Sequence, residues 1–257
     1  MGASLALYWS TMRIALLTDI HGNREAFSAC LAHARLLNAD RFMFLGDYVG
    51  YGADPVWVVE TVMAAVAEGA VALLGNHDAA IDGSDADMNR LAREAIAWTR
   101  AQLSPQHRAF LAGLPLTFEQ EDALFVHANG YAPGTWDYIS GPIEAARCFS
   151  LTSFRLTFCG HVHVPMLYNI GSTGKVGQFD PRPGMDIPLL PTRTWLAVIG
   201  AVGQPRDGIP AANYALFDTD RRSLRFLRVA YDASAAARRI RDAGLPEQLA
   251  SRLEGGH

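Results

Sequence analysis

Cysteine is scarce in this chain, and the three cysteines form no disulfide framework. Cys30, Cys148 and Cys159 are far apart in the sequence, and each lies in an apolar segment. Isolated cysteines in apolar segments are usually buried thiols of proteins from a reducing compartment. The sequence therefore predicts three free cysteines and a cytoplasmic protein.

Long apolar runs are also missing, since no stretch approaches the roughly 20 apolar residues that cross a bilayer. The apolar residues 5–9 are too few for the core of a signal peptide, and no basic segment precedes them. We therefore expect no membrane association. Met12 begins a predicted buried strand, so residues 1–11 are predicted to be an extension outside the fold and residues 12–257 a single domain.

Positive charge is not in excess, because 22 Lys and Arg stand against 26 Asp and Glu, giving a net charge of −4. The chain thus lacks the general basic surface that a long nucleic acid requires, and a polyanion would have to be held locally, for example by a metal. A chain that is 50% hydrophobic and 19% charged is typical of a globular protein, which excludes disorder.

Apolar runs alternate with stretches of helical spacing, which predicts an α/β protein with a β-α-β half followed by a strand-rich half. Asp54-Pro55 and Ser104-Pro105 are typical helix starts. Residues 180–192 are expected to be a long surface loop, and Ala233 to Leu253 an amphipathic covering helix. The predicted strands are 13–18, 41–45, 70–74, 114–118, 123–127, 155–159, 164–170, 194–199, 213–218 and 223–230; the predicted helices are 23–37, 55–68, 88–102, 105–112, 142–149 and 233–243.

Metal-binding and polar side chains follow five of these strands directly. The carboxyl ends of strands in an α/β sheet are where ligand sites form, so these five segments are expected to converge. Side chains two residues apart in a strand lie on the same face, so Asp19 and His21 are expected to point in the same direction. Five of the eight histidines lie at these strand ends. The segments contain Asp19 and His21, then Asp47, then Asn76, His77 and Asp78, then His127, and finally His161 and His163.

The residue types indicate which ions would bind. Imidazole, carboxylate and amide ligands without thiolates suit Mn²⁺, Fe, Zn²⁺, Co²⁺ or Ni²⁺ better than Mg²⁺ or Ca²⁺. Seven candidate ligands are too many for one ion. Two ions that share one carboxylate would form the kind of centre that holds the attacking and leaving oxygens of a phosphoryl displacement.

In order and spacing these motifs resemble the signature of the calcineurin-like metallophosphoesterase superfamily. They read Asp19-x-His21, Gly46-Asp47-x-x-Gly50, Gly75-Asn76-His77-Asp78, His127 and Gly160-His161-x-His163. The segments Gly46 to Gly52 and Gly203 to Asp207 are similar to the small bacterial branch grouped with phosphodiesterases and diadenosine tetraphosphate hydrolases. The resemblance implies a four-layer α/β/β/α sandwich with two mixed β-sheets and a metal site at the carboxyl ends of strands.

The resemblance also implies a role for each motif residue. His77 would contact the phosphoryl oxygen or protonate the leaving group, and Asp78 would hold the His77 ring. The chain departs from the family where Gly200-Ala201 replaces the usual Gly-Ser, which touches no metal ligand. Asp19, His21 and His163 would hold the first metal; Asn76, His127 and His161 would hold the second; Asp47 would bridge them.

A charge count supports the chemistry. Two divalent ions with Asp19, Asp47, a bridging hydroxide and neutral histidines leave a net charge of about +1, which attracts a phosphodiester although the protein is acidic. The metals also make hydroxide available at neutral pH for in-line attack on phosphorus. Arg206 is a candidate phosphate contact. Tyr51 is a candidate substrate contact, and Tyr48, Tyr51 and Trp136 are candidates for stacking on a nucleobase.

The leading interpretation is a dinuclear-metal hydrolase of phosphodiester or phosphoanhydride bonds in small nucleotide-like substrates. A phosphomonoesterase or protein phosphatase is the enzymatic alternative, and a metal-binding regulatory module without turnover is the non-enzymatic one. Gly171 to Lys175 includes a Gly-Lys pair, but the flanking residues do not complete a phosphate-binding P-loop, so a hairpin turn is expected there.

Overall fold

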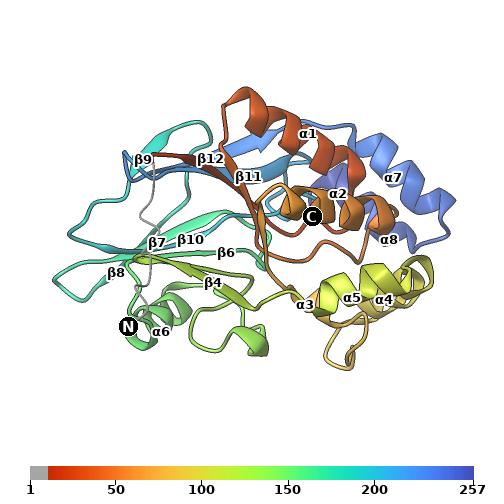
Figure 1. The fold of residues 1–257 in the computed structure, drawn as a ribbon, viewed down its shortest axis with the longest axis horizontal. Coiled ribbons are helices and arrows are strands. Elements are labelled where there is room, and N and C mark those ends of the chain that lie inside the picture. Colours follow the sequence, from red (N-terminus) through yellow and green to blue (C-terminus); the bar gives the residue numbers. More distant parts are fainter. Residues whose placement is uncertain (1–10) are drawn as a thin grey trace.

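Two mixed β-sheets lie face to face in the computed structural model, which describes residues 11–257, and helices cover their outer faces (Figure 1). This confirms the predicted four-layer α/β/β/α sandwich. The predicted extension lies outside the described residues except for Thr11. A single domain over residues 12–257 stays a prediction.

The first sheet has the strand order β3-β2-β1-β11-β12-β9. Strands β1, β2 and β3 run parallel, whereas β11 pairs with β1 in the antiparallel direction. The parallel strands therefore end at one edge of the sheet. The bounds are Arg13–Leu17 for β1, Arg41–Phe44 for β2, Val71–Ala72 for β3, Ala212–Asp218 for β11, Ser223–Val229 for β12 and Asp186–Pro188 for β9.

The second sheet has the order β4-β5-β6-β10-β7-β8. Its central strands β5, β6 and β10 are parallel, and β7 with β8 forms a hairpin around the turn expected at Gly171 to Lys175. Each sheet draws strands from both halves of the sequence, so the two predicted halves do not correspond to the two sheets. The bounds are Thr117–Gln120 for β4, Ala123–Val126 for β5, Leu156–Cys159 for β6, Thr194–Val198 for β10, Met166–Ile170 for β7 and Val176–Phe179 for β8.

The helices start where the sequence supplies caps. The Asn23 side chain accepts the amide of Ala26 at the start of α1, and the Ser104 side chain caps α5. Helix α1 packs on β11 and β12, and α6 packs on β7 and β8. The helices are α1 Arg24–Leu36, α2 Pro55–Ala67, α3 Asn76–Ala79, α4 Arg90–Gln102, α5 Pro105–Ala112, α6 Pro142–Leu151, α7 Ala233–Asp242 and α8 Glu247–Gly255, with a 3₁₀ turn η1 at Pro133–Thr135.

Strand β1 shows how the layers are held together. Ile14 and Leu16 pack between the two sheets, whereas Ala15 and Leu17 face the helices on the outer side. All four side chains are fully buried. A strand covered on both faces is continuously apolar, which is why the apolar run in this segment predicts a buried strand.

Four sequence predictions differ from the structure. The predicted loop 180–192 contains the short edge strand β9, and β3 covers only two residues of the predicted strand 70–74. The predicted strand 114–118 is shifted, since β4 begins at Thr117 and is set by its hairpin with β5. The predicted covering helix is two helices, because Gly244 has a positive φ of 70° and Pro246 follows it.

The three cysteines are free and buried, as predicted. Among residues 11–257, no helix is both long and apolar enough to span a membrane.

Candidate metal centre

The seven predicted metal ligands meet in one place, at the carboxyl ends of strands from both sheets. They lie on the segments that follow β1, β2, β3, β5 and β6, which are far apart in sequence but end side by side. The structure therefore brings together every predicted ligand: Asp19, His21, Asp47, Asn76, His127, His161 and His163.

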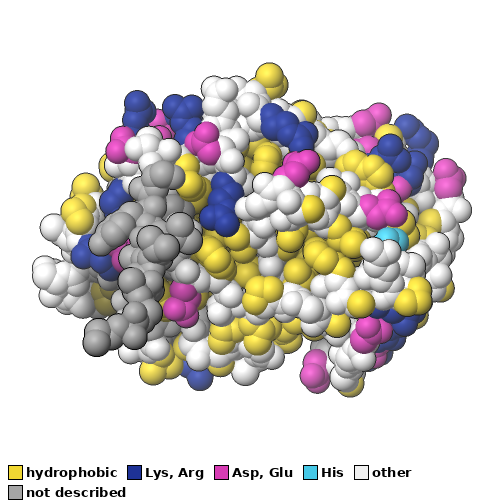
Figure 2. All heavy atoms as spheres, in the orientation of Figure 1, with side chains coloured by type: hydrophobic (Ala, Val, Ile, Leu, Met, Phe, Trp, Pro, Cys, Tyr) yellow, Lys and Arg dark blue, Asp and Glu magenta, His cyan; other side chains and the backbone are white. Residues whose placement is uncertain are grey.

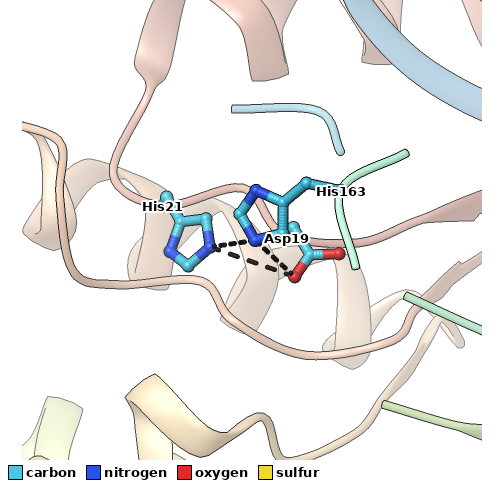
Figure 3. A group of neighbouring side chains, drawn as sticks. All are labelled: Asp19, His21 and His163. Atoms are coloured by element: carbon cyan, nitrogen blue, oxygen red, sulfur yellow. Dashed lines mark hydrogen bonds and ion pairs between the residues drawn. The ribbon is translucent and has the colours of Figure 1, made fainter. Parts of the chain in front are cut away.

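The first group consists of Asp19, His21 and His163, whose side chains point toward one another (Figure 3). The Nε2 atoms of His21 and His163 are 3.2 Å apart. Oδ1 of Asp19 lies 3.3 Å from Nε2 of His163 and 3.9 Å from Nε2 of His21. All three side chains are buried, so these atoms face a single protected point.

The second group surrounds Nε2 of His127. This atom lies 3.1 Å from Oδ1 of Asn76, 3.2 Å from Nδ1 of His161 and 3.4 Å from Oδ2 of Asp47. His127, His161 and Asp47 are buried, whereas Asn76 is partly exposed. The second group thus offers nitrogen and oxygen ligands of the kind the sequence predicted.

Asp47 connects the two groups through one oxygen. Its Oδ2 is 3.6 Å from Nε2 of His21 and 3.4 Å from Nε2 of His127. Its other oxygen, Oδ1, accepts the backbone amide of His77 at 2.9 Å, which fixes the carboxylate plane. A single carboxylate oxygen therefore lies between two ligand sets, where a shared metal ligand would have to be.

Backbone carbonyls orient three of the imidazole rings. Nδ1 of His21 donates to the carbonyl of Val49 at 3.0 Å, and Nδ1 of His127 donates to that of Leu45 at 2.8 Å. Nδ1 of His163 donates in the same way to Gln204 at 2.6 Å. A proton held on Nδ1 leaves the Nε2 lone pair free, which is the arrangement that metal-binding histidines usually show.

The unpaired atoms of the cluster fit divalent cations. The facing Nε2 atoms of His21 and His163 are both lone-pair donors when their protons are on Nδ1, so they do not bond to each other. Asp19 Oδ1 and His161 Nε2 are buried and have no hydrogen-bond partner among the described residues. Burial raises the pKa of Asp47, but the imidazoles of His127 and His77 hold it well below its usual range, so the carboxylate is charged. Buried lone pairs and charge of this kind are compensated by a metal.

Five of the seven ligands have a left-handed backbone conformation, with φ between 48° and 67°, and these are Asp19, His21, Asp47, His161 and His163. This conformation costs about 1–3 kcal/mol for a residue with a side chain and is typical of functional sites. Bonds between the loops maintain it: the amides of Ile20 and His21 both donate to the carbonyl of Asp47, and the amide of Gly203 donates to that of Asp19. The rest of the fold therefore stabilises the ligand geometry.

His77 lies next to His21 of the first group and to the shared Asp47. Its ring is buried, 4.7 Å from the ring of His21, and the absence of a side chain at Gly50 makes room for its Nδ1. Among residues 11–257, that nitrogen has no hydrogen-bond partner. One ring nitrogen also lies within 4.8 Å of ligand atoms of His21 and Asp47.

The prediction that Asp78 holds the His77 ring is wrong. The Asp78 carboxylate accepts the backbone amides of Asp47 at 2.7 Å, Tyr48 at 2.9 Å and Gly75 at 3.0 Å, with a longer bond from Val49. Burial and the charge of Asp47 raise the pKa of Asp78 to about 8, and the amide donors oppose this rise. Asp78 therefore positions the loop that presents Asp47.

The predicted substrate contacts differ in whether the structure leaves their side chains accessible to a substrate. Tyr48 is not available for stacking, because it is fully buried and its hydroxyl donates to the carbonyl of Leu73. Tyr51 is only 4% exposed and packs between His21 and His77, so it has no open face for a nucleobase. Trp136 contacts the ring of His127 edge-on. Arg206 is partly exposed, and its guanidinium lies 5.9 Å from the ring of Tyr51.

Tyr138 was missed by the sequence analysis. Its ring stacks on that of His161 at 4.1 Å with an interplanar angle of 18°, although the residue is 51% exposed. It lies in the irregular segment between β5 and α6, where no periodic pattern identifies functional side chains. The only available signal is that this segment directly follows His127.

Comparison with known proteins agrees with this geometry. Residues 12–165 match the calcineurin-like phosphoesterase family, so the chain belongs to that family of metal-dependent phosphoesterases. A metallophosphoesterase from Sphaerobacter thermophilus has the same fold with a TM-score of 0.85 and 37% identity, covering 96% of this chain and all of that one. An uncharacterized protein of Methanocaldococcus jannaschii is 33% identical over 93% of this chain and 96% of its own length. A hypothetical protein of Pyrococcus horikoshii, 19% identical, shares the fold over 95% of this chain and 98% of its own, with a TM-score of 0.76.

Proposed function

We propose that this metallophosphoesterase hydrolyses phosphodiester or phosphoanhydride bonds in small nucleotide-like substrates. The observation that carries the proposal is the position of Asp47 Oδ2, within 3.6 Å of one ligand group and 3.4 Å of the other. Such a shared carboxylate is what a centre of two divalent ions requires. Mn, Fe and Zn are the ions that suit this ligand set.

Each group would hold one ion. Asp19, His21 and His163 would hold the first, and Asn76, His127 and His161 the second, with Asp47 shared. When bound, the two ions would supply activated water and positive charge opposite the phosphoryl oxygens. The carbonyls of Val49, Leu45 and Gln204 accept a hydrogen bond from Nδ1 of three of the histidines and so orient their Nε2 atoms for this task.

His77 would act on the substrate rather than on the metals. Burial lowers the pKa of His77 to about 4, so its ring is neutral at pH 7. A neutral ring offers one N–H donor, which can hydrogen-bond to a phosphoryl oxygen or to the oxygen of the leaving group. Its second nitrogen has no competing partner among the described residues.

Surface charge supports a small substrate. Basic and acidic side chains are intermingled on the face shown in Figure 2, which offers no continuous positive stripe for a nucleic-acid backbone. The positive charge would come from the metals, which reach only the phosphoryl groups next to them. We therefore expect a substrate with one or a few phosphates.

Turnover of two aryl esters in the presence of added metal tests the proposal. With Mn²⁺, Zn²⁺ or Fe²⁺, bis(p-nitrophenyl) phosphate should be hydrolysed with a higher kcat/KM than p-nitrophenyl phosphate, and a chelator should abolish both rates. A preference for the monoester would favour a phosphomonoesterase or protein phosphatase. Rates equal to those of metal in buffer would indicate a metal-binding module without turnover.

A further inference from the structure

We propose that Tyr51 is a positioning residue, which holds the ring of His77 in the orientation that catalysis requires. Its side chain connects the packing of the C-terminal helices α7 and α8 to the metal centre. The inference rests on the proposed function, because it explains how the group that we expect to act on the substrate is oriented.

The ring of His77 requires a support that hydrogen bonding at Nδ1 does not supply. Among residues 11–257 this nitrogen has no hydrogen-bond partner, and the Asp78 carboxylate accepts backbone amides instead. An acid–base group has to lie within hydrogen-bond reach of the oxygen on which it acts, and a small displacement of such a group slows the reaction strongly. Packing against neighbouring side chains therefore has to orient the ring.

Two rings pack directly on His77. The ring of Tyr51 lies 4.6 Å from it at an interplanar angle of 54°, and the ring of His21 lies 4.7 Å from it at 76°. Tyr51 and His21 are also 4.7 Å apart, so each of the three rings contacts the other two. His21 is oriented independently, because its Nδ1 donates to the carbonyl of Val49. Tyr51 is therefore the neighbour on which the orientation of His77 depends most.

Apolar side chains of three helices hold Tyr51 in place. The residue is 4% exposed and has a left-handed backbone conformation with a φ of 62°. This conformation is uncommon for a residue with a side chain and persists only where the surrounding structure supports it. The support comes from a hydrophobic cluster at the end of the molecule where α4, α7 and α8 lie (Figure 1). Besides Tyr51, this cluster contains Ala92 and Ala95 of α4, Ile240 of α7, and Leu249 and Leu253 of α8.

An ion pair also joins α7 to the loop that contains Tyr51. Arg239 of α7 donates from both Nε and Nη2 to the carboxylate of Asp54. The Arg239 side chain is 44% exposed, and exposed ion pairs contribute little to stability. The apolar packing of Tyr51, rather than this ion pair, is therefore the main connection between the C-terminal helices and His77.

Two substitutions of Tyr51 test the inference with the metal-loaded enzyme and bis(p-nitrophenyl) phosphate. Tyr51→Leu removes the ring and should lower kcat about 10- to 100-fold, the range for a displaced catalytic group, with little change in KM and with both metals retained. Tyr51→Phe keeps the ring and should recover most of kcat. If Tyr51→Leu does not fold, Tyr51→Met replaces it, since the longer side chain fills more of the space. Tyr214→Leu is the matched control, because it removes a buried tyrosine whose ring contacts His33, and it should keep kcat.

A double-mutant cycle shows whether Tyr51 acts through His77. In the His77→Ala background, Tyr51→Leu should change kcat by no more than about twofold, because the ring that it positions is already absent. An equal loss in both backgrounds would overturn the inference, since Tyr51 would then act on another group. So would a wild-type kcat for Tyr51→Leu, or the loss of an ion, which would show that Tyr51 supports His21. Failure of the proposed function is a different result, namely no metal-dependent hydrolysis by the wild-type enzyme.

Discussion

Replacing Asp47 by alanine should abolish turnover and metal binding together. The substitution removes the one oxygen that lies near both His21 and His127, and it also removes the acceptor for the backbone amide of His77. Because the charge that stabilises the transition state depends on both metals, we expect the rate to fall at least about 10³-fold. Elemental analysis after reconstitution, alongside the rate with bis(p-nitrophenyl) phosphate, measures both effects.

Asp220→Ala serves as the matched control, since it removes an exposed carboxylate outside the centre. The control should keep its metal and its rate. An Asp47→Ala protein that retains both ions would show that this carboxylate is not shared between them.

Replacing His77 by alanine should separate catalysis from metal binding. The ring contacts that of His21, but His77 is not one of the seven predicted metal ligands, so its removal keeps all seven side chains. We expect both metals to remain bound while kcat falls about 10²- to 10⁴-fold, the usual range for a positioned acid–base group. Metal content and steady-state kinetics of the same preparation give the comparison.

The result is informative because His77 also lies within reach of His21 and Asp47. If His77→Ala lost an ion, the ring would be a metal ligand, and the role we assign to it would be wrong. His107→Ala removes a histidine on α5 that faces Glu60 of α2 instead of the metal ligands, and it should change neither metal content nor rate.

The sequence predicted the composition of the centre because its ligands follow buried strands. Apolar runs such as β1 are recognisable without a structure, and parallel strands bring their carboxyl ends to one edge. The side chains of Asp19 and His21 do converge, but not because they alternate along a strand. Strand β1 ends at Leu17, and both residues have a left-handed backbone conformation. Their geometry depends on bonds to the Asp47 loop, which no local pattern encodes.

Contacts between distant loops account for the remaining differences. Nothing in the sequence around Asp78 shows whether its carboxylate accepts a hydrogen bond from a neighbouring ring or from the amides of another loop. In the folded protein it accepts the amides of the other loop. Tyr138 lies in an irregular segment, and its stacking on His161 becomes visible only in three dimensions. Tyr48 was misjudged for the same reason, because it follows the motif Asp47 but points into the core.

Metal stoichiometry tests the central claim most directly. The apoprotein would be titrated with Mn²⁺ or Zn²⁺ at neutral pH, and bound metal and turnover would be measured at each step. Two ligand groups that share Asp47 predict that both quantities saturate at two ions per chain. Saturation of both at one ion per chain would contradict the account.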